Sequence, residues 1–238
     1  MPEVDTRKYY EDFSTSYDRM RDSPYHGMLD ELCIEIAAPY ARGHRVLELG
    51  CGTGRILGPL NEMAAEAIGV DFASGMVAQA KSRGLDARHA DLCELPFPDA
   101  SFDLTCSFKV LPHVPDPRRA IAEAARVTKR TGHLILEVYN PISLRYLAKR
   151  LGGARPVGEG ARTEAEVPTR WETRRAAVAL LPEDTALVDH FGVRIFTPFA
   201  GVHRVPLFGD LLRKAERAGM RSPLRSLGGF LVLLVRKT

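Results

Sequence analysis

Three glycines at alternate positions form the part of the sequence best suited to hold a small ligand. They belong to residues 48–54, which read ELGCGTG, between an expected strand at 44–49 and an expected helix at 55–65. Glycine allows a tight turn and lets a ligand come close to the backbone. The first turn of the following helix offers unpaired N–H groups to a carboxylate or phosphate. The segment therefore predicts a ligand-binding loop where a strand meets a helix.

The residues around this loop narrow the choice of ligand. A mononucleotide-binding loop requires Gly-Lys followed by Ser or Thr, and a dinucleotide loop requires a glycine at position 55, where this chain has Arg55. Asp71 ends the next expected strand, 67–71, and an acidic residue at that point can accept hydrogen bonds from both hydroxyls of a ribose. NAD and S-adenosylmethionine both contain such a ribose, so both remain candidates at this stage.

S-adenosylmethionine fits the polar groups of the loop better than NAD, which stays the weaker alternative. This ligand has no phosphate, but its carboxylate suits the backbone N–H groups near 52–54. Its ammonium group suits the backbone carbonyl of Gly50, the nearby side chain of Glu48 and the strand end at Ser107.

Three further residues are placed to hold an adenine ring. Asp91 follows the third expected strand, 87–90, and can accept a hydrogen bond from the adenine amino group. Leu92 and Phe72 can pack on the two faces of the ring. Each residue alone is ordinary, but their spacing together supports an adenosine-containing ligand.

The elements that must position these residues follow an alternating pattern. Strands alternate with helices of 10–15 residues, which predicts crossover connections and a parallel sheet. One helix is missing near the end, which predicts that an antiparallel strand completes the sheet. The remaining expected strands are 102–107, 133–139, 192–197 and 229–236. Three further helices are expected. The first is capped by Ser74 and ended by Gly84, the second is capped by Asp116 and followed by Gly132, and the third is capped by Asp210 and ended by Gly219.

These motifs resemble those of class I S-adenosylmethionine-dependent methyltransferases. The similarity is greatest to the type 11 group, which includes ubiquinone and menaquinone biosynthesis C-methyltransferases. It rests on the segments 46–54, 69–72, 90–99, 101–103, 110–116 and 125–132. The resemblance covers about 46–138 and says more about cofactor and fold than about substrate.

The resemblance implies an α/β fold with three layers, a Rossmann-like sheet of six parallel strands and one antiparallel strand. In a single domain it implies an N-terminal lid at 1–43, a cofactor-binding core at 44–140, a substrate cap at 141–190 and a strand-helix-strand unit at 191–238. It also implies that the cofactor contacts the whole loop, including Cys51, Gly52 and Thr53. Met76 would border the adenine, and Tyr17 would reach the methionine end from the lid.

The resemblance further implies an enzyme that transfers a methyl group to a nucleophile by in-line displacement. The protein then mainly aligns the two reactants. His113 follows the fourth strand and is the candidate general base. A histidine that caps its loop or contacts the cofactor is the favoured alternative, because Pro112 stands where many relatives have another histidine. Lys109 and Tyr139 lie at strand ends on the same edge, where either could touch substrate.

Charge and composition bear on partners and location. Residues 1–139 hold 16 Lys/Arg against 21 Asp/Glu, while residues 140–238 hold 17 against 9. We interpret the excess of positive charge in residues 140–238 as a solvated basic face. A small-molecule methyl acceptor is therefore favoured over nucleic acid. The alternatives are an RNA methyltransferase that uses the basic segment 145–175 and a non-catalytic S-adenosylmethionine-binding module. That segment contains Arg145, Lys149, Arg150, Arg155, Arg162, Arg170, Arg174 and Arg175.

The longest apolar run near the end, 230–235, has six residues, whereas a membrane span needs about 20. The N-terminus lacks an apolar signal core, which predicts a cytoplasmic protein without a membrane partner. We expect a monomer or a homodimer. The four cysteines show no metal-ligand spacing, so buried thiols are expected and no metal site is predicted.

Overall fold

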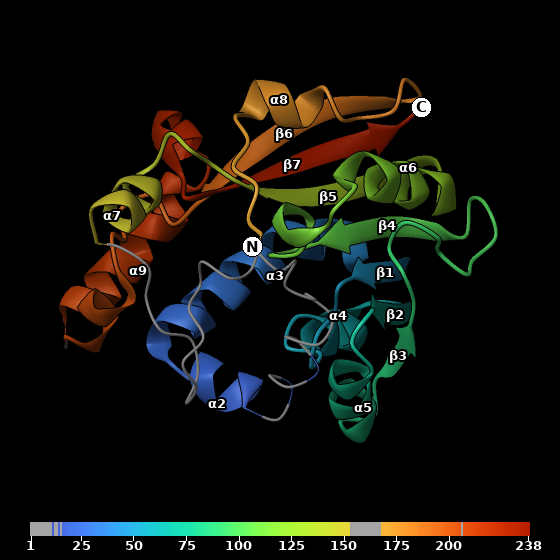
Figure 1. Cartoon of the computed structure of the whole chain (residues 1–238), viewed down its shortest axis with the longest axis horizontal. Coiled ribbons are helices and arrows are strands. Elements are labelled where there is room, and N and C mark those ends of the chain that lie inside the picture. The colour runs from blue at the N-terminus through green and yellow to red at the C-terminus, as the bar shows by residue number, and fades with distance from the viewer. Residues whose placement is uncertain (1–10, 12–13, 15, 153–167, 206) are drawn as a thin grey trace.

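Seven strands form one sheet in the computed structural model, which describes residues 11, 14, 16–152, 168–205 and 207–238. The strand order across the sheet is β3-β2-β1-β4-β5-β7-β6 (Figure 1). β7 runs antiparallel to both β5 and β6, and every other pairing is parallel. Six strands therefore run in one direction and one runs in the other, which confirms the predicted fold class. The strands are β1 Arg45–Leu49, β2 Glu66–Asp71, β3 Asp86–His89, β4 Phe102–Ser107, β5 Thr128–Tyr139, β6 Thr185–Val193 and β7 Phe230–Lys237.

Helices cover both faces of this sheet and bury two separate apolar clusters. One face carries α3 (Pro24–Ala41), α4 (Leu57–Met63) and α5 (Ser74–Ser82). The opposite face carries α6 (Pro117–Val127) and α8 (Arg174–Val178). Strand residues alternate between the two clusters, as the period of two in a strand requires. The result is the three-layer arrangement visible in Figure 1.

The strand order reverses at β1, which marks one point on the edge of the sheet. The chain runs outward from β1 through β2 to β3, and then returns to the other side of β1 to form β4. Ligands of open α/β sheets bind at such a reversal, outside the carboxyl ends of the strands. The loop after β1 and the residues that end β2 and β4 meet at this point, so the fold brings the predicted site residues to one edge.

Two helix ends form as the sequence predicts. Asp116 accepts a hydrogen bond from the backbone N–H of Arg119 at 3.0 Å and so caps α6, which begins at Pro117. Gly84 follows α5 with a φ of +77°, a left-handed value that glycine adopts without strain.

Three other helix predictions are wrong. α5 has Ala73 at its cap position, and Ser74 is its first residue. α6 ends at Val127 because the chain passes directly into β5, so Gly132 lies inside a strand. α9 (Phe208–Gly219) begins two residues before Asp210, which therefore lies in its first turn.

The segments outside the central core also differ from expectation. The second half of the expected lid at 1–43 is α3, whose apolar face is buried against the sheet in the core. The expected cap at 141–190 contains α7 (Leu144–Gly152) and α8, but its end already belongs to β6. The strand expected at 192–197 is this β6, displaced towards the N-terminus. β6 is displaced because its pairing with β7, rather than local pattern, fixes the strand.

The described residues contain four free cysteines and no helix suited to span a membrane. Cys33, Cys51 and Cys106 are buried free thiols, and Cys93 is partly exposed. No helix in the part of the chain that the structure describes has the length and apolar character needed to cross a membrane.

Candidate functional site

The glycine loop after β1 turns back on itself and is tied to the end of β2. Gly50, Gly52 and Gly54 all have positive φ values, of +70°, +53° and +87°. The backbone N–H groups of Gly50 and Cys51 both donate to the carbonyl of Val70, at 2.7 and 3.0 Å. A Cβ atom on Gly52 would meet no heavy atom within 4 Å, so this side of the loop is open. The loop is therefore rigid and leaves backbone accessible, as the sequence predicts for a ligand loop.

Asp71 connects this loop to the turn that follows β2. Its carboxylate accepts one hydrogen bond from the N–H of Gly52 and another from the N–H of Ala73, both at 2.9 Å. Burial raises the pKa of Asp71, while these backbone N–H groups act in the opposite direction. A carboxylate has about four acceptor positions, so two such bonds leave capacity for hydroxyl donors. Asp71 thus lies at the edge of the sheet beside the loop, where a ribose-binding carboxylate is expected.

Glu48 is a buried acid in β1, immediately before the loop. Only 2% of its surface is exposed, and its Oε2 atom has no hydrogen-bond partner. Burial raises the pKa of Glu48 well above its ordinary value, and the charge of Lys109 opposes this effect. An unpartnered buried carboxylate oxygen is costly, and a cationic ligand group would satisfy it. The residues present therefore fit the ammonium end of S-adenosylmethionine.

The remaining predicted cofactor residues gather at the same edge, with different exposures. Met76 and Leu92 are buried at 2% and 5% exposure, while Phe72 is half-buried and Asp91 is exposed. Asp91 already accepts a hydrogen bond from the N–H of Cys93 at 2.8 Å. Ser107 is fully buried, and its hydroxyl donates to the carbonyl of Leu49 at 3.3 Å. The side chain of Ser107 therefore holds β4 against β1 and supports the loop.

The N-terminal segment lies against the loop through residues that the sequence analysis did not identify. Thr53 donates from its hydroxyl to Asp18 at 2.7 Å, and Asp18 also pairs with Arg83 and lies 4.0 Å from Arg55. Tyr17 precedes Asp18 on α2 (Tyr17–Arg21). The guanidinium of Arg21 lies 4.9 Å from the ring centre of Tyr17, and the contact of Tyr17 with the cofactor stays a prediction.

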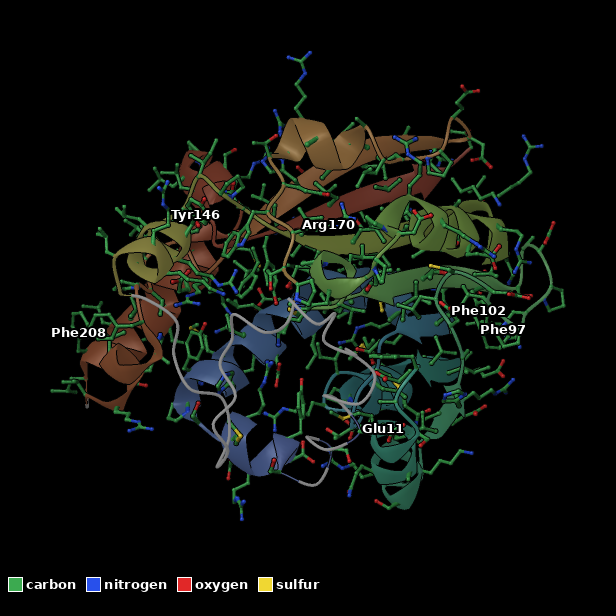
Figure 2. All side chains as sticks on the ribbon, viewed as in Figure 1. Glu11, Phe97, Phe102, Tyr146, Arg170 and Phe208 are labelled. Carbon is green, nitrogen blue, oxygen red and sulfur yellow. The ribbon has the colours of Figure 1, made fainter. Side chains whose placement is uncertain are left out.

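Glu11 performs the capping that the sequence assigns to Ser74. Its carboxylate accepts from the backbone N–H groups of Ser74 and Gly75, at 2.6 and 2.8 Å, and thereby satisfies the first turn of α5. Figure 2 shows Glu11 beside the start of α5. No sequence motif connects residues separated by 63 positions, so only tertiary structure reveals this contact.

His113 lies in a short 3₁₀ turn (Leu111–His113) near the tip of β5. Its Nδ1 is 3.1 Å from the carbonyl oxygen of Pro168, and its Nε2 is 3.4 Å from the hydroxyl of Tyr139. A carbonyl only accepts, so Nδ1 carries the proton and Nε2 is left to accept. Burial lowers the pKa of His113 to about 4. The imidazole is therefore neutral at pH 7, and its Nε2 accepts from the Tyr139 hydroxyl.

Lys109, which the sequence analysis placed at a strand end where it could touch substrate, pairs with groups of the protein itself. Its ammonium group pairs with Asp30 at 2.5 Å, and its backbone N–H donates to Glu137 at 3.2 Å. Arg55 completes the cluster through a 2.8 Å hydrogen bond to Asp30. Lys109 thus satisfies buried acids between α3 and the sheet.

The fold and the loop at its strand tips define a class of protein. A sheet of this order with one antiparallel strand, a glycine loop after β1 and an acid at the end of β2 define a class I S-adenosylmethionine-dependent methyltransferase fold. Residues 47–136 match the family model described as "Methyltransferase domain", type 11. This part of the chain thus matches a type 11 methyltransferase domain, and the cofactor implied by that family and by the fold is S-adenosyl-L-methionine.

Individual relatives agree with this assignment. The chain is 34% identical over 115 residues to a probable S-adenosylmethionine-dependent methyltransferase of Mycolicibacterium smegmatis, covering 48% of this chain and 45% of that protein. It is 35% identical over 138 residues to the 27-O-demethylrifamycin SV methyltransferase of Amycolatopsis mediterranei, covering 51% and 48%. The chain thus spans about half the length of these curated relatives.

A solved structure supports the fold across almost the whole chain. It is a S-adenosylmethionine-dependent methyltransferase of Thermotoga maritima, described as a possible histamine N-methyltransferase. The two share 20% identity with a TM-score of 0.67, over 97% of this chain and 99% of that one. At this level of identity the likeness concerns the fold alone.

Proposed function

We propose that this chain transfers the methyl group of S-adenosylmethionine to a small-molecule acceptor. The observation that carries the proposal is the pairing of two buried acids with one glycine loop. Asp71 is fixed beside the loop for the ribose, and Glu48 has an unpartnered oxygen for the ammonium group. The cofactor supplies an electrophilic methyl carbon on its sulfonium, and the protein supplies alignment and exclusion of water.

Each part of the site has a separate role in this proposal. The N–H groups of Gly50, Cys51, Gly52 and Gly54 already donate within the protein, contrary to the expectation that N–H groups near 52–54 bind the carboxylate of the methionine portion. The carbonyl of Gly50 and Glu48 bind its ammonium group. Phe72, Met76 and Leu92 enclose the adenine, while Asp91 accepts from its amino group. Cys51 and Thr53 complete the loop, Ser107 supports it, and Tyr17 covers it from the N-terminal segment. Together these contacts would hold the methyl carbon towards the tips of β4 and β5.

The basic segment supports a small acceptor better than RNA. Arg170 donates from Nη2 to the carbonyl of Pro115 at 2.8 Å, so it stabilises a loop. Arg174 and Arg175 belong to α8, which packs on one face of the sheet. Arg155 and Arg162 lie outside the described residues. Arg145, Lys149 and Arg150 share α7, but Arg170, Arg174 and Arg175 lie on other elements. The described cations are therefore divided between separate elements, whereas a single-strand reader needs a continuous basic groove with stacked aromatic side chains.

Calorimetry with S-adenosylhomocysteine tests the cofactor, with NADH as the competing ligand. We expect saturable binding of the homocysteine product and none of NADH. Incubation of the protein with S-adenosylmethionine and a host metabolite extract should then produce a compound heavier by 14 Da, which is one CH₂. Binding without any such product would favour a non-catalytic binding module, and tight NADH binding alone would reject the proposal.

We further expect His113 to stay neutral at pH values where an ordinary histidine is protonated. At pH 5.5, a histidine with a pKa of about 4 is roughly 97% neutral, against roughly 9% for a pKa of 6.5. The ring therefore takes up a proton only near pH 4, below the range in which an ordinary histidine titrates. The measurement is an NMR titration of the histidine rings, with His113→Asn to assign the signal. A midpoint for His113 near 6.5 would contradict this expectation.

The same variant separates the two roles considered for His113. A general base contributes typically 10²–10⁴-fold to rate, so loss of a base would slow turnover far more than it weakens binding of S-adenosylhomocysteine. Equal losses in both would identify His113 as a binding residue.

A further inference from the structure

Arg145 on α7 is enclosed by aromatic rings, and one nitrogen of its guanidinium has no hydrogen-bond partner. Its guanidinium carbon lies 4.0, 4.5 and 4.8 Å from the ring centres of Tyr139, Phe230 and Trp171. Its Nη1 atom is buried and has no hydrogen-bond partner. Ring faces attract a cation, but they do not replace hydrogen bonds. A buried N–H donor without an acceptor is costly, which points to an acceptor that the protein itself does not provide.

The nearby buried acid does not fill this role. The charge of Arg145 opposes the burial that raises the pKa of Glu137 to about 7. The Glu137 carboxylate, however, accepts its hydrogen bonds from the backbone N–H of Lys109 at 3.2 Å and from the thiol of Cys33 at 3.8 Å. Glu137 is thus committed to the α3 side of the sheet.

The surrounding backbone holds Arg145 in place before any ligand arrives. The Asn140 side chain donates to three carbonyls, those of Ile142, Ser226 and Gly228, at 2.9–3.0 Å, which fixes the entry to α7. A Cβ atom on Gly229 would come within 3.0 Å of both Cβ and Cδ of Arg145, so the arginine stem packs directly on this glycine. A cation fixed in this way loses little further entropy on binding an anion.

This arginine lies on the acceptor side of the predicted active site. Tyr139 ends β5 and pairs with Phe230 at the start of β7, on the same edge of the sheet as the glycine loop. The ring of His113 lies 5.5 Å from that of Tyr139. β1 and β5 are separated by β4 alone, which puts them roughly 10 Å apart across the sheet at about 4.8 Å per strand. Leu49 is level with Leu136, and Tyr139 lies three residues further along β5, so the two tips are roughly 14 Å apart. A small molecule held at Arg145 can therefore span the distance to the loop. In Figure 2, Tyr146 marks α7 beside this group.

We propose that Arg145 binds an anionic group of the methyl acceptor, which is therefore a small molecule with a carboxylate or phosphate next to an aromatic or apolar body. The proposal rests on the function proposed above. The planar guanidinium matches both anions through paired N–H groups and stacks on aromatic faces at the same time. Tyr139 and Trp171 then contact the apolar body, while His113 lies beside it.

Trp171 provides a direct reporter because it is the only tryptophan in the chain and its ring contacts Arg145. The protein, saturated with S-adenosylhomocysteine, is titrated with benzoate, phenyl phosphate and the neutral isostere benzamide, and Trp171 fluorescence is followed. We expect benzoate or phenyl phosphate to change the fluorescence saturably and benzamide to bind at least tenfold more weakly. The stronger of the two anions identifies the acceptor group as carboxylate or phosphate.

Two variants of α7 complete the test. Arg145→Met keeps an apolar stem among the rings, and we expect it to weaken anion binding by about 10- to 100-fold, the loss of hydrogen bonds to a charged group. Arg150→Met removes an equal charge from an exposed position of the same helix and should leave anion binding unchanged. If Arg145→Met does not fold, Arg145→Lys retains charge but not the paired donors, and should still weaken binding.

Several outcomes would overturn the proposal. One is that benzamide binds as well as benzoate, or that neither anion binds. Another is an unchanged anion affinity in the Arg145 variants. A third is preferential binding of benzyltrimethylammonium, which would identify the rings as a cation site. Calorimetry with S-adenosylhomocysteine on the same samples reports the cofactor site separately. Its failure would reject the proposed function, whereas normal cofactor binding without anion binding would reject only the role of Arg145.

Discussion

Replacing Asp71 with alanine is expected to lower the affinity for S-adenosylhomocysteine by at least about 100-fold. The carboxylate lies at the tip of β2 beside the glycine loop and has acceptor capacity left for two ribose hydroxyls. A hydrogen bond to a charged group contributes about 1.5–3 kcal/mol, and about 1.4 kcal/mol corresponds to a factor of ten. Calorimetry on the purified variant measures the change directly.

The same substitution also removes the acceptor for the N–H groups of Gly52 and Ala73. We therefore expect a loss of about 1–3 kcal/mol in the free energy of unfolding, which urea denaturation would measure. Asp86→Ala is the matched control, because Asp86 is an exposed acid at the start of β3 that pairs with Arg88. Asp86→Ala should bind S-adenosylhomocysteine normally. Unchanged affinity in Asp71→Ala would remove this acid from the cofactor site.

Alanine at Gly50 and at Gly52 should have opposite main effects, although both glycines have positive φ. A Cβ on Gly50 would lie 2.3 Å from Cγ2 of Val110, so Gly50→Ala combines backbone strain with a steric clash. Strain of about 1–2 kcal/mol and overpacking of about 1–3 kcal/mol predict a severe loss of stability. A Cβ on Gly52 would meet no protein atom and would project into open space.

Gly52→Ala should therefore fold, and its free energy of unfolding should fall only by the backbone strain. It should nevertheless bind S-adenosylhomocysteine at least about tenfold more weakly, because a ligand can no longer approach the backbone closely. Urea denaturation and calorimetry on the two variants separate stability from binding. Equal stabilities of the two variants, or normal cofactor affinity in Gly52→Ala, would show that the open side of the loop does not face the ligand.

The local parts of the site are those that the sequence predicts well. The glycine loop, the acid that ends β2 and the Asp116 cap each depend on a few neighbouring residues whose backbone preferences are strong. The strand at 102–107 is found with the same bounds, and five of its six residues are buried. In contrast, the strand expected at 192–197 is displaced, because its register depends on pairing with β7.

The contacts that close the site lie beyond local pattern. Glu11 caps α5 from a distance of 63 residues, and Asp18 binds Thr53 across 35 residues. Pro24–Ala41 belongs to the core because its apolar residues meet the sheet, although its position before the first strand favoured a lid. Lys109 at a strand end suggested substrate contact, but Asp30 of that helix binds it.

The sequence by itself determined the order of strands and helices, the ligand loop and the acid paired with it, because glycine conformations, helix caps and apolar periodicity act within a few residues. Only the tertiary structure decided which charges are satisfied internally. It committed Lys109 to Asp30, left one oxygen of Glu48 without a partner, and placed Arg145 among the rings of Tyr139, Phe230 and Trp171. Burial and pairing depend on residues brought together from distant parts of the chain, and these properties distinguish a structural charge from one available to a ligand.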